Sequence, residues 1–235
     1  MLCVFLLIST SWAAATPVVF VHGNGDNAQT WDDVITSYRA AGYVPENLTA
    51  ITYLSEEQQA SPRGNLHTQE QSELVARALE AVGPRVDVVA HSLGVTTALH
   101  AIESFGLWPR IRKFVGIAGA LRGLSSCLAA SPWFPNPPTC LGQDPWDPDR
   151  FGFHPFFNPL MATNGFRAMP KSAPSTSFYV IHAGADDEIT CSTGWGCDTS
   201  LFEPAPNVLE QVQVEGGHFG ARSRTAALQL RMLAR

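Results

Sequence analysis

The sequence has few charged residues and no run of basic ones. Only 15% of its 235 residues are charged and 45% are hydrophobic, which is typical of a compact folded domain. Lysine and arginine number 15 against 21 acidic residues, and the formal net charge is −6. Proteins that hold nucleic acid through its phosphates carry a surplus of basic residues on one face. The composition therefore argues against a nucleic-acid partner.

Several motifs of cofactor and repeat proteins are also absent. The sequence contains no Cys-x-x-Cys pair, so the usual spacing of zinc ligands is missing and we expect no metal. It contains no phosphate-binding loop of the P-loop type and no Gly-x-Gly-x-x-Gly after a strand, so we expect no nucleotide cofactor. No internal repeat is found, and we expect residues 16–235 to form a single domain.

Long hydrophobic runs are lacking as well. An apolar run at residues 1–8 is too short to span a bilayer and is followed by alanines at 13–15. We expect residues 1–15 to be a secretory signal peptide, although no basic residue precedes the run, and a buried first strand is the alternative. No later stretch has the length of a membrane helix. We therefore expect a secreted, extracellular protein without stable membrane insertion.

The cysteine count supports an oxidising compartment. Four cysteines follow residue 15, at positions 127, 140, 191 and 197. An even number of cysteines in a secreted chain favours disulfides. The short loops favour Cys127 with Cys140 and Cys191 with Cys197.

Short apolar runs rich in β-branched residues alternate with helical patterns along the chain. Six of these runs are interpreted as strands: 18–21, 49–53, 86–90, 113–117, 178–182 and 211–214. The run at 86–90 is apolar on both faces, as in a parallel sheet covered by helices on both sides. Between the runs, residues 68–82 form one expected helix, with Leu74, Ala78 and Val82 on its buried face. The pattern predicts an α/β fold with a doubly wound, mainly parallel sheet.

One segment does not follow this alternation. Residues 123–175 contain many prolines and aromatic residues, and the prolines exclude a long helix. The segment either forms a cap or substrate-binding flap above the sheet, or packs as a loop that seals the core. If it is a flap, its aromatic side chains are the candidate substrate contacts: Trp133, Phe134, Phe153 and Phe156.

Ser92 lies at the end of the third expected strand, in the sequence Ala90-His91-Ser92-Leu93-Gly94. A helical pattern follows directly. A serine on a sharp turn from strand to helix has a strained main chain, and small residues two positions before and after it let the turn pack. Such a turn exposes the hydroxyl group above the sheet. We expect Ser92 to be a nucleophile.

A serine nucleophile needs a base and a carboxylate that orients it. His218 follows the last expected strand within Gly216-Gly217-His218, where a glycine loop can hold an imidazole above the strand ends. The other six histidines lack this context. Three acids, Asp186, Asp187 and Glu188, follow the fifth expected strand and compete for the role of the acid. The spacing from Gly184 favours Asp187, with Asp186 as the alternative.

The same chemistry needs two main-chain N–H groups for the oxyanion. The residue after the nucleophile, Leu93, supplies one. The loop after the first strand, His22-Gly23-Asn24-Gly25, is rich in glycine and lets the main chain approach a ligand. We expect the amide of Asn24 to be the second donor.

These motifs resemble those of a known family. The sequences VVFVHGNG at 18–25, VDVVAHSLG at 86–94, IAGA at 117–120 and DEI at 187–189 are similar to those of the class 2 lipases. The form Ala-x-Ser-x-Gly resembles small secreted Bacillus-type lipases and related extracellular poly(3-hydroxybutyrate) depolymerases. The resemblance covers residues 17–125 well and 178–220 through motifs, but not the aromatic segment.

The resemblance implies a minimal α/β-hydrolase with the order Ser, Asp, His and without a cofactor or metal. It supports Ser92, Asp187 and His218 as a triad, with Asn24 and Leu93 as oxyanion donors. The expected activity is hydrolysis of carboxylic esters by a monomer acting on ester or lipid substrates. A polyester depolymerase is the first alternative, and a non-catalytic hydrolase-like binding protein is the second. The triad alone also allows an acyltransferase or an amidase.

Overall fold

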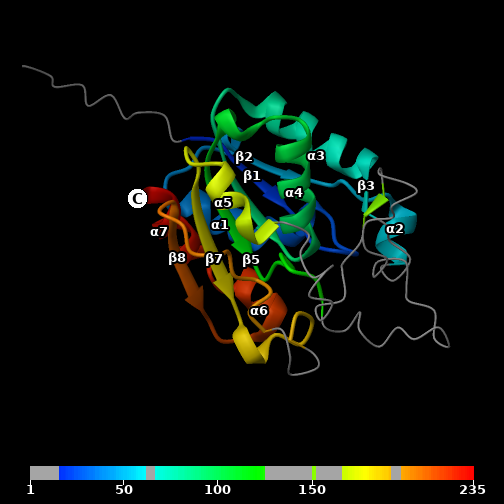
Figure 1. Cartoon of the computed structure of the whole chain (residues 1–235). Helices are drawn as coiled ribbons and strands as arrows, with labels where there is room; N and C mark the ends of the chain where they lie inside the picture. The colour runs from blue at the N-terminus through cyan, green and yellow to red at the C-terminus, as the bar shows by residue number, and fades with distance from the viewer. Residues whose placement is uncertain (1–15, 62–66, 125–149, 152–165, 192–196) are drawn as a thin grey trace, which may run out of the picture.

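Six strands form one sheet in the order β2–β1–β4–β5–β7–β8, and every pair in it is parallel (Figure 1). The computed structural model describes residues 16–61, 67–124, 150–151, 166–191 and 197–235. The strands are β1 (Val18–Val21), β2 (Leu48–Ile51), β4 (Val86–His91), β5 (Ile111–Ile117), β7 (Ser177–His182) and β8 (Val208–Gln213). The predicted doubly wound α/β sheet is confirmed.

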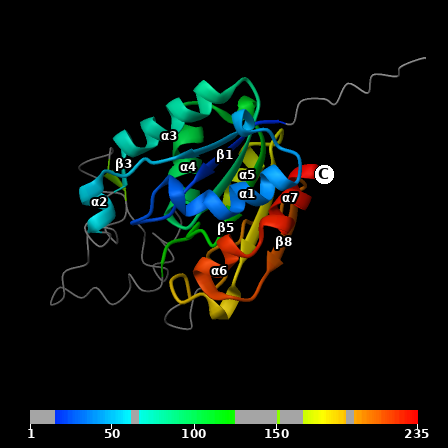
Figure 2. The ribbon, with the colours of Figure 1, turned by 180° about the vertical axis from the view of Figure 1, so that it is seen from behind.

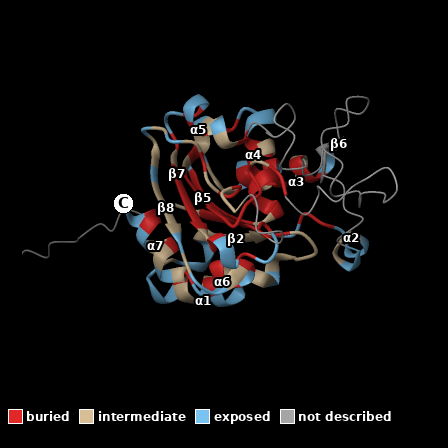
Figure 3. Ribbon diagram, turned by 60° about the horizontal axis from the view of Figure 1, so that its bottom comes forward, coloured by how far each residue is buried: buried red, intermediate tan, exposed pale blue. Residues whose placement is uncertain are grey.

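Helices cover both faces of the sheet. The helices α3 (Gln69–Val82) and α4 (Leu93–Ser104) pack on one face (Figure 1). The helices α1 (Asp32–Ala40), α6 (Gly217–Ser223) and α7 (Ala226–Ala234) pack on the other (Figure 2). Every residue of β1 and β4 is buried, and the buried residues concentrate in the middle of the sheet (Figure 3). This two-sided burial explains why these strands are apolar on both faces.

The shorter elements complete the described chain. They include the helices α2 (Glu56–Ala60) and α5 (Met169–Ser172). The 3₁₀ turns are η1 (Ala28–Trp31), η2 (Pro45–Asn47), η4 (Trp108–Arg110), η7 (Phe166–Ala168) and η8 (Gly184–Asp186). A second, two-stranded sheet pairs β3 (His67–Thr68) with β6 (Arg150–Phe151) in antiparallel orientation. Strands of two residues leave no periodic pattern, and the sequence did not predict this sheet.

The buried face of α3 differs from the predicted one. Leu74 was expected to face the core but is 43% exposed, whereas Val75 and Leu79 are fully buried. Val82 packs at the margin of the core. The buried stripe of α3 instead runs through Ser72, Val75, Ala76 and Leu79, whereas Ala78 is half-buried. The helix is thus rotated relative to the predicted face, and it packs against α4.

The two edge strands begin and end at other residues than expected. Strand β8 begins at Val208 and ends at Gln213, whereas residues 211–214 were predicted. Strand β2 begins at Leu48 and ends at Ile51, whereas residues 49–53 were predicted. Both strands are mostly half-buried, because each has only one neighbour in the sheet. Polar residues are tolerated there, so the apolar run did not mark the true boundaries.

Strand order places a site above the sheet between β1 and β4. The chain runs from β1 outward to β2 and then returns to the other side of β1 as β4. At such a switch point the loops leave neighbouring strands in opposite directions and open a crevice at the carboxyl ends of the strands. The loops that border this crevice begin at His22 and Ser92.

Several predicted features lie outside the described residues. They are the signal peptide at 1–15, the pair Cys127 and Cys140, and the aromatic residues Trp133, Phe134, Phe153 and Phe156. The division into a signal peptide, a single domain and an insert at 123–175 stays a prediction. Of the described residues near the end of that segment, Phe166 is buried in the same core cluster as residues of α3 and α4.

Candidate active site

Ser92 occupies a strained turn between β4 and α4. Its main-chain angles are φ 55° and ψ −125°, a region that residues other than glycine rarely adopt. Its amide donates a hydrogen bond of 2.9 Å to the carbonyl oxygen of Ile117 at the end of β5. The predicted sharp turn is therefore present, and the sheet holds it in place.

Two glycines let the neighbouring loop approach this turn. A β-carbon at Gly94 would lie 2.6 Å from the carbonyl oxygen of Val21, and one at Gly23 would lie 2.9 Å from the β-carbon of Ser92. Real β-carbon contacts are longer, so each position requires glycine. Consequently the loop after β1 packs directly against the serine turn.

The loop after β1 is held by a buried histidine and a tyrosine. The ring of His22 stacks on Tyr53 at 4.4 Å between centroids, and the hydroxyl of Tyr53 donates to the His22 carbonyl at 2.9 Å. The Nδ1 of His22 donates to the carbonyl of Gly23 at 2.8 Å. Asn24 is partly buried in this loop, and Leu93 is the buried first residue of α4. The two predicted oxyanion donors thus lie on the two segments that meet at Ser92, Asn24 in the loop after β1 and Leu93 at the start of α4.

Asp187 and His218 form a buried pair. The Nδ1 atom of His218 lies 2.9 Å and 3.1 Å from the two carboxylate oxygens of Asp187, and their side chains are 2% and 1% exposed. Asp186, the alternative acid, is exposed at the end of η8. Of these two acids, the structure brings Asp187 to the imidazole.

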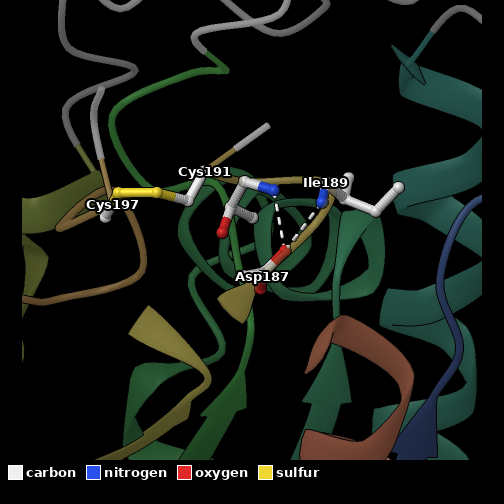
Figure 4. Close-up of a disulfide and its surroundings, with 5 residues drawn as sticks. Asp187, Ile189, Cys191 and Cys197 are labelled. Atoms are coloured by element: carbon white, nitrogen blue, oxygen red, sulfur yellow. Dashed lines mark hydrogen bonds between the residues drawn. A yellow bond between two sulfur atoms is a disulfide. The ribbon is translucent and has the colours of Figure 1, made fainter. Parts of the chain in front are cut away.

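The carboxylate of Asp187 is held in its ionised form. Burial raises the pKa of this carboxyl group, but hydrogen bonds from His218 and from the amides of Thr190 and Ile189 lower the pKa by more than burial raises it. The net result is a pKa below its ordinary value. The two amides donate to the same carboxylate oxygen at 2.8 Å and 3.0 Å (Figure 4). Asp187 is therefore negatively charged at neutral pH and can hold the protonated Nδ1 of His218.

A disulfide lies a few residues after this acid in the sequence. Cys191 is bonded to Cys197, as the spacing predicted (Figure 4). The amide of Cys191 also donates to the carbonyl oxygen of Asp187 at 2.9 Å. The covalent link and this hydrogen bond restrain the segment that begins at Asp187.

Replacing both Cys191 and Cys197 with alanine is expected to destabilise the protein by about 2 kcal/mol, because the short loop gains freedom in the unfolded chain. For a chain of this length that corresponds to a fall of about 4 to 8 °C in the melting temperature. Calorimetry under oxidising conditions measures this difference. An unchanged melting temperature would contradict a stabilising role for the disulfide.

Two further residues, His91 and Glu188, contact the main chain of His218, and the sequence did not predict these contacts. The Nε2 of His91 lies 3.2 Å from the carbonyl oxygen of His218, and the two rings are 4.8 Å apart. A carboxylate oxygen of Glu188 accepts a hydrogen bond of 2.8 Å from the amide of His218. Through His91, the serine turn meets the first turn of α6.

His91 is neutral in this arrangement. A carbonyl oxygen only accepts hydrogen bonds, so Nε2 carries the proton and Nδ1 does not. Burial, together with the nearby charges of His218 and Arg222, holds the pKa of His91 well below its ordinary value. Arg222 is itself paired with Asp26 of the β1 loop at 2.8 Å.

The buried histidines make the stability of the fold depend on pH. Burial lowers the pKa of His22 and His91, both at most 1% exposed, below the ordinary value of 6.5. As the pH falls, these histidines become protonated in the unfolded chain at a higher pH than in the folded chain. Stability is therefore greatest above this value and falls as the pH drops below it, by up to about 1.4 kcal/mol per pH unit for each histidine.

Urea denaturation at about pH 7 and about pH 5.5 tests this dependence. We expect a lower free energy of unfolding at the acidic pH. Equal or greater stability there would contradict the assignment of His22 and His91 as neutral buried groups.

Within the described part of the chain, no group of three or more histidine, cysteine or acidic side chains is placed to hold a metal ion. In the same ranges, no helix is both long enough and apolar enough to cross a membrane.

Comparison with known proteins shows related sequences. A family model described as Lipase (class 2) matches residues 15–230. Two proteins from Oryza sativa, each named probable esterase PIR7A, are 36% identical over 87 residues, which is 37% of this chain. The match spans only 33% of the length of these curated relatives.

Solved structures share the fold at low sequence identity. The mature lipase BlEst2 of Bacillus licheniformis superimposes with a TM-score of 0.62 at 16% identity, over 94% of this chain and 92% of that one. Aspergillus fumigatus lipase B gives a TM-score of 0.60 at 16% identity, over 96% of this chain and 55% of that one. Polyneuridine aldehyde esterase gives 0.55 at 16% identity, over 94% and 98%.

The parallel sheet, its strand order and these neighbours define the minimal α/β-hydrolase fold. The family match covers nearly the whole chain, so the chain belongs to the class 2 lipase family. This confirms the resemblance seen in the sequence motifs.

Proposed function

We propose that this protein is a secreted serine hydrolase that cleaves carboxylic esters through Ser92, His218 and Asp187. The observation that carries the proposal is the buried hydrogen-bonded pair of His218 and Asp187. Its histidine contacts His91, the residue before the strained Ser92. The family match and a structural neighbour named as a lipase support ester hydrolysis.

The pair determines which nitrogen of His218 can act as a base. Nδ1 carries the proton that Asp187 accepts, so Nε2 has a free lone pair. In the proposed mechanism Nε2 takes the hydroxyl proton of Ser92 as its oxygen attacks the ester carbonyl. His218 then gives this proton to the leaving alcohol, and an acyl-enzyme forms on Ser92. Water hydrolyses the acyl-enzyme with His218 again acting as base.

The negative charge that develops on the carbonyl oxygen needs donors. The amide of Leu93 is in the first turn of α4, whose main-chain N–H groups and dipole favour negative charge. The amide of Asn24 lies on the β1 loop, which Gly23 brings against Ser92. We propose these two amides as the oxyanion donors. Loss of one such donor typically lowers turnover by about 100- to 1000-fold.

Two exposed apolar side chains, one next to the proposed base and one near the proposed acid in the sequence, favour an apolar substrate. Phe219 is 52% exposed and Ile189 is 38% exposed. The ring of Phe219 packs edge-on against His218 at 5.3 Å between centroids. Both residues follow a member of the triad closely in sequence. We propose a lipid or another ester with a short or medium acyl chain as the substrate.

Hydrolysis of p-nitrophenyl esters of rising acyl length, beside emulsified triacylglycerols and polyhydroxybutyrate films, tests this function. We expect turnover of the soluble esters, and the acyl-length profile separates an esterase from a lipase. Clearing of the film without turnover of soluble esters would assign a depolymerase instead. A folded protein that is inactive on all three substrates would contradict the proposal.

A further inference from the structure

The main chain of His218 is held on both sides of its α-carbon. Its amide donates to a carboxylate oxygen of Glu188 at 2.8 Å, and its carbonyl accepts from Nε2 of His91 at 3.2 Å. Its ring is bonded to Asp187 at 2.9 Å. Asp187 and Glu188 are consecutive residues, so one short segment holds both the ring and the amide.

The helix α6 has no capping side chain of its own. Its N-cap residue is Gly216, with φ 106°, and a glycine offers no side-chain acceptor. The first N–H groups of a helix lack partners within the helix and need an acceptor from elsewhere. Glu188 supplies this acceptor from the loop after β7. A carboxylate makes a stronger hydrogen bond than a neutral oxygen and suits the positive end of the helix.

The sequence at Gly217 accommodates this carboxylate. Gly217 has φ 70°, and a β-carbon there would lie 2.6 Å from the same oxygen of Glu188 that binds the amide of His218. The carboxylate therefore occupies the space that a side chain at position 217 would need. Both glycines before His218 thus favour the contact with Glu188. Gly216 leaves the helix without a capping side chain, and Gly217 leaves space for the carboxylate of Glu188.

We propose that Glu188 is a positioning residue for His218, which fixes the first turn of α6 so that the imidazole keeps its place between Asp187 and Ser92. The inference rests on the proposed catalytic role of His218. Glu188 acts on the main chain and has no direct part in proton transfer. A misplacement of a catalytic group by about 1 Å can lower a rate by about 100-fold.

Kinetics of two variants at this position test the proposal. We expect Glu188→Ala to lower kcat by about 10- to 100-fold and to change KM by less than about threefold, because Glu188 orients the base. Glu188→Gln keeps an oxygen that can accept the amide hydrogen bond. We therefore expect it to restore kcat to within about threefold of the wild type.

Glu215→Ala is the matched control, since Glu215 is an exposed acid of the same type in the loop before α6. We expect it to retain wild-type kcat. The proposal is overturned if Glu188→Ala retains wild-type kcat, if Glu188→Gln is as slow as Glu188→Ala, or if Glu215→Ala is equally slow. Circular dichroism confirms that each variant is folded.

Ser92→Ala, measured in the same series, separates this inference from the proposed function. Loss of activity in Ser92→Ala beside wild-type kcat in Glu188→Ala overturns only the role of Glu188. Wild-type turnover in Ser92→Ala overturns the proposed function and, with it, the positioning role of Glu188.

Discussion

Replacing Ser92 with alanine is expected to lower kcat for a p-nitrophenyl ester by about 10⁴- to 10⁶-fold. The substitution removes the single oxygen that attacks the ester carbonyl in the proposed mechanism. Ser92 is partly exposed at its turn, and its side chain provides no capping hydrogen bond to α4. We therefore expect the variant to fold and to melt near the wild-type temperature.

Ser104→Ala is a suitable control for this loss. Ser104 is the last residue of α4, is exposed, and contacts His100 one turn earlier. We expect this variant to retain wild-type activity. If Ser92→Ala kept a tenth or more of the wild-type rate while folded, Ser92 would not be the nucleophile.

Replacing Asp187 with asparagine is expected to lower kcat by about 10⁴-fold. An asparagine has nearly the same shape but can donate a hydrogen bond to Nδ1 of His218. The proton of the imidazole then moves to Nε2, which can no longer accept the hydroxyl proton of Ser92. The variant also loses the negative charge that stabilises protonated His218 during the reaction.

Asp186→Asn is the matched control, because Asp186 precedes Asp187 directly and points into solvent. We expect its kcat to lie within about twofold of the wild type, measured with the same ester. Comparable losses in both variants would show that the effect comes from charge near the site. Wild-type activity in Asp187→Asn would remove Asp187 from the triad.

The position of the serine turn could be predicted because its signals are local. An apolar strand, small residues at 90 and 94, and a helical pattern after Ser92 all lie within about twenty residues. The strain at Ser92, with φ 55°, and the close packing of Gly94 on β1 follow from this arrangement. Local signals of this kind can be recognised in the sequence without knowledge of the tertiary fold.

The choice between Asp186 and Asp187 could not be made with certainty from the sequence. Consecutive residues of a loop point in different directions, and the 3₁₀ turn η8 decides which side chain turns inward. Asp186 is the last residue of this turn and is exposed, whereas Asp187 follows the turn and contacts His218. The sequence contains the two acids but not the direction of the turn.

The contacts of His91 and Glu188 with His218 could not be predicted, because they join distant parts of the chain. His91 is 127 positions from His218 and Glu188 is 30 positions from it. Both contacts are to the main chain of His218, and such contacts leave no pattern of residue types. The only related signal is the pair of glycines before His218, which cannot cap the helix that follows.

The most direct test of Ser92 as an activated nucleophile is labelling of the folded protein with a fluorophosphonate, followed by peptide mapping. We expect one adduct, on the hydroxyl oxygen of Ser92. We expect no adduct in Ser92→Ala and much slower labelling in Asp187→Asn. An adduct on another residue, or a folded and ester-cleaving protein that forms none, would contradict the claim that Ser92 is an activated nucleophile.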